Sequence, residues 1–286
     1  MELVDIDWLK EAGPGLPRVP VLGVPVDENS SYEPGAAEAP EAIAKRLFWA
    51  GGNPWTESGA NLSQSGLFSY VGAFAENAKD TFVQLSEATQ WLARSGYRPI
   101  LIGGDHSISI PILRGLSKVY GDLSILHIDA HPDLYDDFDD NPNSHASPFA
   151  RIMEEGLAKR LVQVGIRTLV PHLREQIARF GVECFEMCKE DRLPQLNFDG
   201  PVYLSIDMDG LDPAFAPGVS HREPGGLTTR QVIDLIHATA GHLVAADVVE
   251  YNPRFDIGDM TAQVAAKLVR EAAGVMLKEA LSRGRK

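Results

Sequence analysis

The chain has 286 residues and a formal net charge of −14, because 40 acidic residues outnumber 26 basic ones. This balance argues against binding to nucleic acid, whose phosphates an acidic protein repels, and the lack of an apolar run of about 18 residues argues against a membrane span. The hydrophobic content of 44% is that of an ordinary globular protein. The first residues resemble neither a signal peptide nor a transit peptide, so we expect a cytoplasmic location.

Short apolar runs typical of buried strands alternate with segments of helical spacing along the chain. The predicted strands are residues 19–24, 99–102, 123–128, 161–166, 202–206 and 243–249. The predicted helices are residues 77–95, 149–158, 229–240 and 261–283. Residues 49–72, rich in Gly, Ser and Asn, are expected to form a long surface loop. The alternation predicts an α/β fold of three layers (α/β/α) around a mostly parallel sheet, in a single domain over residues 1–286.

Two cysteines, Cys184 and Cys188, lie four residues apart. Two thiols cannot build a disulfide framework. We therefore expect both to be reduced packing residues and not a metal site.

Three motifs follow predicted strands and carry six side chains that could bind metal. The motifs are Gly-Gly-Asp-His-Ser, Asp-Ala-His-Pro-Asp and Asp-Met-Asp, and the six residues are His106, Asp129, His131, Asp133, Asp207 and Asp209. Ligands of open parallel sheets bind beyond the carboxyl ends of the strands, and residues two apart on a strand point the same way. The sequence therefore predicts that these side chains converge on one site.

Four carboxylates and two imidazoles restrict the metal. Carboxylate-rich sites suit Mn²⁺, Mg²⁺ or Ca²⁺, whereas structural zinc sites prefer thiolate and imidazole. The two histidines favour Mn²⁺, with Co²⁺, Ni²⁺ or Fe²⁺ as substitutes. Six ligands are too many for one ion that keeps an open position, so we expect two ions that together lower the pKa of a bridging water from about 15.7 towards about 7.

The three motifs, in this order, resemble the arginase/agmatinase (ureohydrolase) family. The resemblance extends from about Val19 to Arg283 and is greatest to plant-type arginases in residues 144–151, 217–221 and 260–271. It implies an arginase-like fold, two Mn²⁺ per subunit, a small cationic guanidino substrate and assembly as a homotrimer or homohexamer. It also implies two ligand sets, which share two carboxylates: His106, Asp129, Asp133 and Asp207 for one ion, and Asp129, His131, Asp207 and Asp209 for the other.

The resemblance also implies roles in catalysis for three residues. Asp133 would orient the attacking hydroxide, and His145 would shuttle protons, a task that suits a side chain titrating near neutrality. Glu250 would bind the substrate guanidinium, which pairs well with a carboxylate. The implied reaction is attack of hydroxide on the guanidinium carbon, followed by release of urea and an amine.

The loop between Asp133 and His145 is where we expect substrate specificity. Animal-type arginases have an Asn two residues after the last Asp of Asp-Ala-His-x-Asp, whereas this chain has Tyr135 there, like agmatinases and plant-type arginases. Three residues could bind a substrate carboxylate instead: Asn141, Asn143 and Ser147. Four Asp residues in the loop would favour agmatine if they face the pocket and would be screened if they are exposed. We expect arginine as the substrate, with agmatine or another guanidino acid as the alternative.

Two alternatives belong to other classes. A histone-deacetylase-like amidohydrolase would use one zinc, which the six-ligand set argues against. A metal-binding pseudoenzyme or regulatory subunit would take up metal without releasing urea. Among the remaining polar residues, Asp105 and Asp212 are expected to cap or support the site, and His127 to lie in the core or behind the ligands. His221 is expected in a surface loop, with a place in the pocket lining as the alternative.

Overall fold

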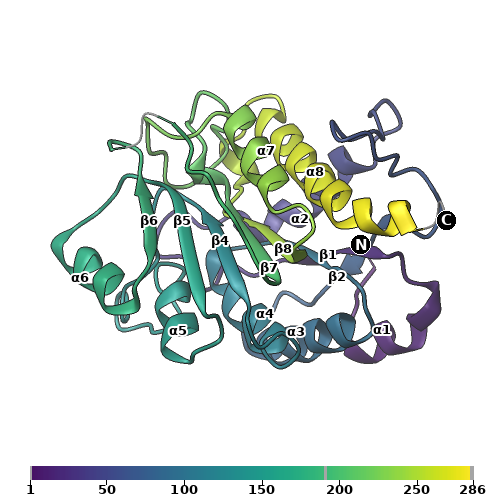
Figure 1. Cartoon of the computed structure of the whole chain (residues 1–286), viewed down its shortest axis with the longest axis horizontal. Helices are drawn as coiled ribbons and strands as arrows, with labels where there is room; N and C mark the ends of the chain where they lie inside the picture. The colour runs from purple at the N-terminus through teal and green to yellow at the C-terminus, as the bar shows by residue number, and fades with distance from the viewer. Residues whose placement is uncertain (1, 190–191, 284–286) are drawn as a thin grey trace.

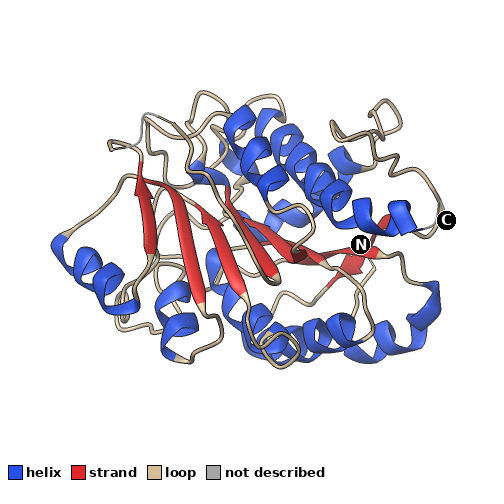
Figure 2. Ribbon diagram, viewed as in Figure 1, coloured by secondary structure: helices blue, strands red, loops and turns tan. Residues whose placement is uncertain are grey.

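The computed structural model describes residues 2–189 and 192–283. Its centre is one sheet of eight parallel strands in the order β2-β1-β3-β8-β7-β4-β5-β6. The strands are β1 (Val19–Val24), β2 (Phe68–Ala73), β3 (Ile100–Gly103), β4 (Ser124–Ile128), β5 (Arg160–Ile166), β6 (Glu183–Glu186), β7 (Val202–Asp207) and β8 (Leu243–Val249). Figure 2 shows the twisted sheet between two layers of helices, which confirms the predicted three-layer fold.

Helices cover both faces of the sheet. The described α-helices are α1 (Ile6–Ala12), α2 (Ala39–Leu47), α3 (Ala78–Arg94), α4 (Ser109–Leu116), α5 (Pro148–Glu154), α6 (Pro171–Phe180), α7 (Thr229–Ala238) and α8 (Met260–Arg283). Helices α2, α7 and α8 pack on one face, and α1, α3, α4, α5 and α6 pack on the other (Figure 1). None of the helices described in residues 2–189 and 192–283 is long and apolar enough to cross a membrane.

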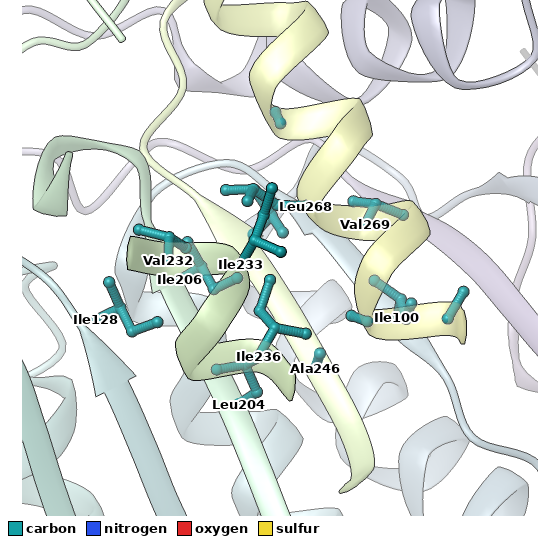
Figure 3. Close-up of a cluster of buried hydrophobic side chains, with 14 of the residues drawn as sticks. Ile100, Ile128, Leu204, Ile206, Val232, Ile233, Ile236, Ala246, Leu268 and Val269 are labelled. Atoms are coloured by element: carbon teal, nitrogen blue, oxygen red, sulfur yellow. The ribbon is translucent and has the colours of Figure 1, made fainter. Parts of the chain in front are cut away.

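Alternation along the strands divides the buried side chains into two cores. Leu204 of β7 belongs to the core under α7 and α8, while its neighbour Tyr203 belongs to the core under α3 and α4. Neighbouring residues of a strand point to opposite faces, so a strand buried on both faces must be apolar throughout. Figure 3 shows the first core, where Ile233 and Ile236 of α7 face the sheet.

Most predicted elements are confirmed, and three expectations need correction. Residues 68–73 are not part of a surface loop but form strand β2, which pairs with β1 at the edge of the sheet. Strand β6, which contains Cys184, was not predicted. Cys184 and Cys188 are free thiols, as expected, but only Cys184 packs against the core, because Cys188 is exposed to solvent.

Candidate active site

Four adjacent strands at the middle of the sheet position the predicted site. They lie in the order β3, β8, β7 and β4, so the segments that follow them meet at one edge. His106 begins a short helix after β3, Asp129 follows β4, Asp207 ends β7 and Glu250 follows β8. The chain therefore brings residues that are up to 144 positions apart, such as His106 and Glu250, into hydrogen-bond contact.

Two imidazoles face the carboxylates from opposite sides of Asp129. Nδ1 of His106 lies 3.3 Å from Oδ2 of Asp129, 3.1 Å from Oδ2 of Asp133 and 3.2 Å from Oδ2 of Asp207. Nδ1 of His131 lies 3.4 Å from Oδ1 of Asp129 and 3.1 Å from Oδ2 of Asp209. Asp129 thus presents one oxygen to each imidazole. This arrangement suits two cations that share a carboxylate.

The donor atoms fit divalent cations on two further grounds. Nδ1 of His106 is buried and makes no hydrogen bond, although three carboxylate oxygens surround it. Burial raises the pKa of Asp207, and the carboxylates of Asp209 and Asp129 raise it further. Such crowded, buried carboxylates repel one another, and bound cations would relieve that repulsion.

A layer of polar side chains behind the cluster orients these donors. Ser205 Oγ lies 2.8 Å from Nε2 of His106 and donates a hydrogen bond of 2.7 Å to Asp247. His127 Nε2 lies 2.7 Å from Oδ2 of Asp129, and Gln163 meets the other ring nitrogen of His127 at 3.0 Å. Partners of this kind fix the orientation of metal-binding side chains. In the sequence, Asp247 stands out as an acid within the otherwise apolar strand β8.

Backbone conformation also distinguishes this edge of the sheet. Asp133 and Glu250 adopt left-handed conformations, with φ of 51° and 61°. Non-glycine residues rarely do so, and strained backbone of this kind clusters at functional sites. Gly104 is required for a different reason, because a Cβ at this position would lie 1.7 Å from the carbonyl oxygen of Val26.

A cavity of about 430 Å³ opens over the cluster. Its wall includes three carboxylates and one imidazole of the cluster, together with His145, Glu250 and apolar side chains such as Phe138 and Leu173; the cluster residues that line it are Asp133, Asp207, Asp209 and His131. His221 lines this cavity, which was the alternative to the expected surface loop, with its ring centroid 5.6 Å from that of His131 and 5.7 Å from that of His145. The physical reason is that the segment after β7 folds back over the carboxyl ends of the strands.

His145 and Glu250 form a buried pair in the cavity wall. Nδ1 of His145 lies 2.9 Å from Oε1 of Glu250, which also accepts a 2.9 Å hydrogen bond from the backbone N–H of His106. Burial lowers the pKa of His145, but the Glu250 carboxylate outweighs this effect and the pKa is raised to about 9. Burial favours the neutral form of Glu250, yet the imidazole holds the pKa of this carboxyl below its usual value.

The residues predicted to bind a substrate carboxylate do not line the cavity. Asn141 donates a hydrogen bond of 3.1 Å to the side chain of Asn29, and Asn143 is exposed. Ser147 is fully buried, and its hydroxyl makes no hydrogen bond. The four loop aspartates are exposed and lie outside the cavity wall: Asp136, Asp137, Asp139 and Asp140.

Arg167, to which the sequence assigned no role, supports the segment that carries Asp209 and His221. Its guanidinium donates hydrogen bonds to the carbonyl oxygens of Gly165, Asp209 and Glu223 at 2.9, 2.6 and 2.6 Å. Asp212 caps the same segment through the N–H groups of Ala214, Gly225 and Gly226, as expected for a supporting residue. These contacts support Asp209 and the neighbouring part of the cavity wall.

Comparison with known proteins gives one consistent result. The family model described as "Arginase family" matches residues 17–274. A mitochondrial arginase of Medicago truncatula is 47% identical over 90% of this chain and 82% of its own length, and a chloroplastic/mitochondrial arginase of Arabidopsis thaliana is 48% identical over 90% and 80%. The solved structure of an arginase from Medicago truncatula has a TM-score of 0.82 and 43% identity, and the match covers 90% of this chain and 87% of that one.

The names of these relatives correct the expected cytoplasmic location. The plant relatives are named mitochondrial or chloroplastic, which points to an organelle and not to the cytoplasm. The expectation depended on the first few residues and on composition. Neither the charge nor the core of a folded domain encodes its location in the cell, because receptors read targeting signals separately.

Proposed function

The chain belongs to the arginase family and is a ureohydrolase, and from this premise we propose that it hydrolyses L-arginine to L-ornithine and urea with two Mn²⁺ ions per subunit. The observation that carries the proposal is the position of Asp129 between two imidazoles, at 3.3 Å from His106 and 3.4 Å from His131. A carboxylate shared in this way supports a binuclear site. The mixture of carboxylates and imidazoles supports Mn²⁺ as its metal.

His106 contacts Asp129, Asp133 and Asp207, and His131 contacts Asp129 and Asp209. We propose these two groups as the ligand sets of the two ions, with Asp207 shared by both sets as the family resemblance implies. When bound, the ions supply the Lewis acidity that makes hydroxide available at neutral pH. Asp133 lies in the cavity wall and is placed to accept a hydrogen bond from the attacking hydroxide.

Glu250 binds the substrate guanidinium in this proposal. Its lowered pKa keeps the carboxylate charged at neutral pH, and it lies in the wall of the cavity. A carboxylate pairs with the planar, permanently charged guanidinium through charge-assisted hydrogen bonds, which are strong in a site that excludes water. The hydrogen bond from the backbone of His106 fixes the orientation of Glu250.

His145 supplies the proton for the departing amine. Its pKa of about 9 means that the imidazole carries a proton at neutral pH. A protonated side chain in the cavity wall can donate to the amine nitrogen as the bond to the guanidinium carbon breaks. The contact with Glu250 then holds the imidazole beside the substrate throughout this transfer.

Arginine is proposed over agmatine because the plant relatives that cover 90% of the chain are named arginases. The exposed loop aspartates do not argue for agmatine, since solvent and salt screen exposed charges beyond about 8–10 Å. Carboxylate binding by Asn141, Asn143 or Ser147 stays a prediction that the cavity does not support. Assembly as a homotrimer or homohexamer is likewise proposed from the family resemblance.

The test is urea release by Mn²⁺-loaded protein, with L-arginine, agmatine and a shorter guanidino acid assayed in parallel. We expect arginine to give the highest kcat/KM. Faster turnover of agmatine would refute arginine as the preferred substrate. Lack of urea from all three compounds would refute the proposed reaction. Metal content measured on the same samples should be two Mn²⁺ per subunit, and sedimentation would give the number of subunits.

A further inference from the structure

The segment that follows β1 encloses the imidazole of His145. The backbone carbonyl of Asn29 accepts a hydrogen bond of 3.1 Å from the backbone N–H of His145. Two groups of Ser31 meet Nε2 of the ring: the backbone N–H at 3.2 Å and the hydroxyl Oγ at 2.8 Å. Glu250 occupies the other ring nitrogen, Nδ1. Both nitrogens of His145 therefore have protein partners, and neither can meet a substrate atom unless one of these contacts breaks.

The partners of the ring determine where its protons can be. A backbone N–H can only donate, so its contact with Nε2 requires a lone pair there and places the remaining proton of the neutral ring on Nδ1, facing Glu250. When His145 is protonated, Nε2 carries a proton, and only the hydroxyl of Ser31 can accept it. Ser31 thus meets Nε2 in both protonation states.

We propose that Ser31 relays the proton between Nε2 of His145 and the amine that leaves the substrate. Ser31 lines the same cavity as His145, Asp133 and Glu250, and it is itself exposed. The hydroxyl is therefore the group at the end of this chain of contacts that substrate and water can reach. The inference rests on the proposed function, because it assigns a route to the proton that the reaction consumes.

The transfer is balanced without any further reactant. The Nε2–H bond of the imidazolium breaks and its proton goes to Oγ of Ser31, while the proton of Oγ goes to the lone pair of the amine nitrogen. Ser31 ends as the neutral alcohol with which it began, His145 becomes neutral and the amine becomes an ammonium ion. The proton released when water ionises to the attacking hydroxide then returns to His145 along the same path in reverse, so that each turnover is balanced in protons.

The charges that face His145 come from several segments. Glu250 after β8, Asp105 after β3 and Asp133 after β4 act on the imidazole electrostatically. His221 faces it from the segment after β7, with ring centroids 5.7 Å apart. The carboxylates favour the protonated ring, whereas the N–H of Ser31 favours the neutral one. Opposing preferences of this kind suit a group that must both bind and release a proton during each turnover.

The variant Ser31→Ala separates relay from orientation, because it removes Oγ but keeps the backbone N–H that holds the ring. We expect kcat for arginine to fall about tenfold or more, within the roughly 10²–10⁴-fold that proton transfer contributes, with KM and the two bound ions per subunit unchanged. In a proton inventory, kcat is plotted against the fraction of D₂O in mixtures of H₂O and D₂O. The plot should be curved for the wild type, in which two protons move in one step, and linear for Ser31→Ala, in which one proton moves. Added small amines should restore part of the rate.

Matched variants complete the experiment. Ser31→Thr keeps a hydroxyl and should retain most of the activity. Ser30→Ala, which alters the preceding residue outside the cavity wall, should behave as the wild type. In a His145→Asn background, Ser31→Ala should cause no further loss, because the two residues act in one path.

Three outcomes would overturn the relay: wild-type kcat and proton inventory in Ser31→Ala, an equal loss in Ser30→Ala, or a full additional loss in the double variant. If the wild type releases no urea from any guanidino compound, the proposed function fails and the relay fails with it. Urea release by the wild type together with an unaffected Ser31→Ala variant would refute the relay alone.

Discussion

Replacing His145 by Asn should make the stability of the protein depend less on pH. The folded structure raises the pKa of this imidazole from 6.5 to about 9, since the Glu250 carboxylate outweighs the opposing effect of burial. A group whose pKa is raised on folding stabilises the folded state fully below its unfolded pKa. This contribution is lost as the pH rises through the folded pKa. The relevant interval therefore runs from about pH 6.5 to about pH 9.

The size of the effect follows from the same values. A rise from 6.5 to about 9 corresponds to about 3 kcal/mol in the free energy of unfolding, since one pKa unit is worth about 1.36 kcal/mol. The His145 side chain is only 9% exposed, so solvent screens the pair with Glu250 very little. The wild type should thus exceed His145→Asn in stability by about 3 kcal/mol more at pH 6 than at pH 10.

Denaturant unfolding of both proteins at pH 6, 8 and 10 measures this difference. The measurement uses protein stripped of metal by a chelator, so that no bound cation competes with the imidazolium. A matched control is His172→Asn, because the His172 side chain is 43% exposed and surface substitutions usually change stability by less than about 0.5 kcal/mol. A stability gap between wild type and His145→Asn that stays constant from pH 6 to pH 10 would refute the assigned pairing with Glu250.

Three further predictions concern other parts of the site. His131→Ala removes the imidazole that lies 3.1 Å from Asp209, so atomic absorption should find one bound ion per subunit in place of two. We expect kcat to fall about 100-fold or more, since loss of even a supporting residue behind a metal ligand costs about 10–100-fold in activity. Two bound ions at full activity would contradict the ligand assignment. Glu250→Gln keeps the shape of the side chain but removes its charge. Steady-state kinetics should show a higher KM and a kcat/KM reduced roughly 10- to 100-fold. Unchanged kinetics would exclude Glu250 from substrate binding. Arg167→Lys keeps the charge but loses the planar guanidinium that donates to several carbonyl groups. A thermal melt should show a Tm lower by several degrees, since each kcal/mol lost from the free energy of unfolding lowers Tm by about 2–4 °C. An unchanged Tm would show that these contacts contribute little to stability.

The arrangement of the sheet was predictable because its signals are local. Runs such as residues 124–128 and 202–206 are buried on both faces in β4 and β7, and only parallel strands covered by helices require such continuous apolar sequence. The edge strand β2 was missed for a related reason. Its Ser69, Tyr70 and Val71 are only partly buried and Gly72 has φ of 139°, so its sequence is close to that of the loop before it.

The clustering of the predicted ligands could be foreseen for the same local reason. Strand β4 ends just before Asp129, and His131 lies two residues further on. Strand β7 ends at Asp207, and Asp209 lies two residues beyond it. Each pair is two residues apart, and the strand before it determines its direction. The left-handed backbone of Asp133 could not be predicted, because it follows from the contacts of the folded site and not from the type of residue.

The rest of the cavity wall depends on contacts between distant segments, and no local pattern encodes these. Ser31 comes from the segment after β1 and meets His145, 114 positions later in the chain. His221 comes from the segment after β7 and faces both His131 and His145. A single exposed serine or a loop histidine carries no periodic signal. Only the folding of the whole chain brings these side chains together. The sequence therefore favoured a surface loop for His221 over its alternative, the pocket lining, which is where the structure places it.

This division between local and distant residues also explains where specificity should be sought. The predicted ligands lie at the ends of strands whose buried sequence cannot change without loss of the core, whereas much of the cavity wall consists of segments that the sheet only supports. In the loop between Asp133 and His145, the aspartates and Asn143 are exposed and outside the cavity wall, whereas Tyr135 and Phe138 line the cavity. Residues that do reach the cavity, among them His221, are therefore the positions at which exchange should alter the choice between a guanidino acid and a guanidino amine while leaving the metal cluster intact.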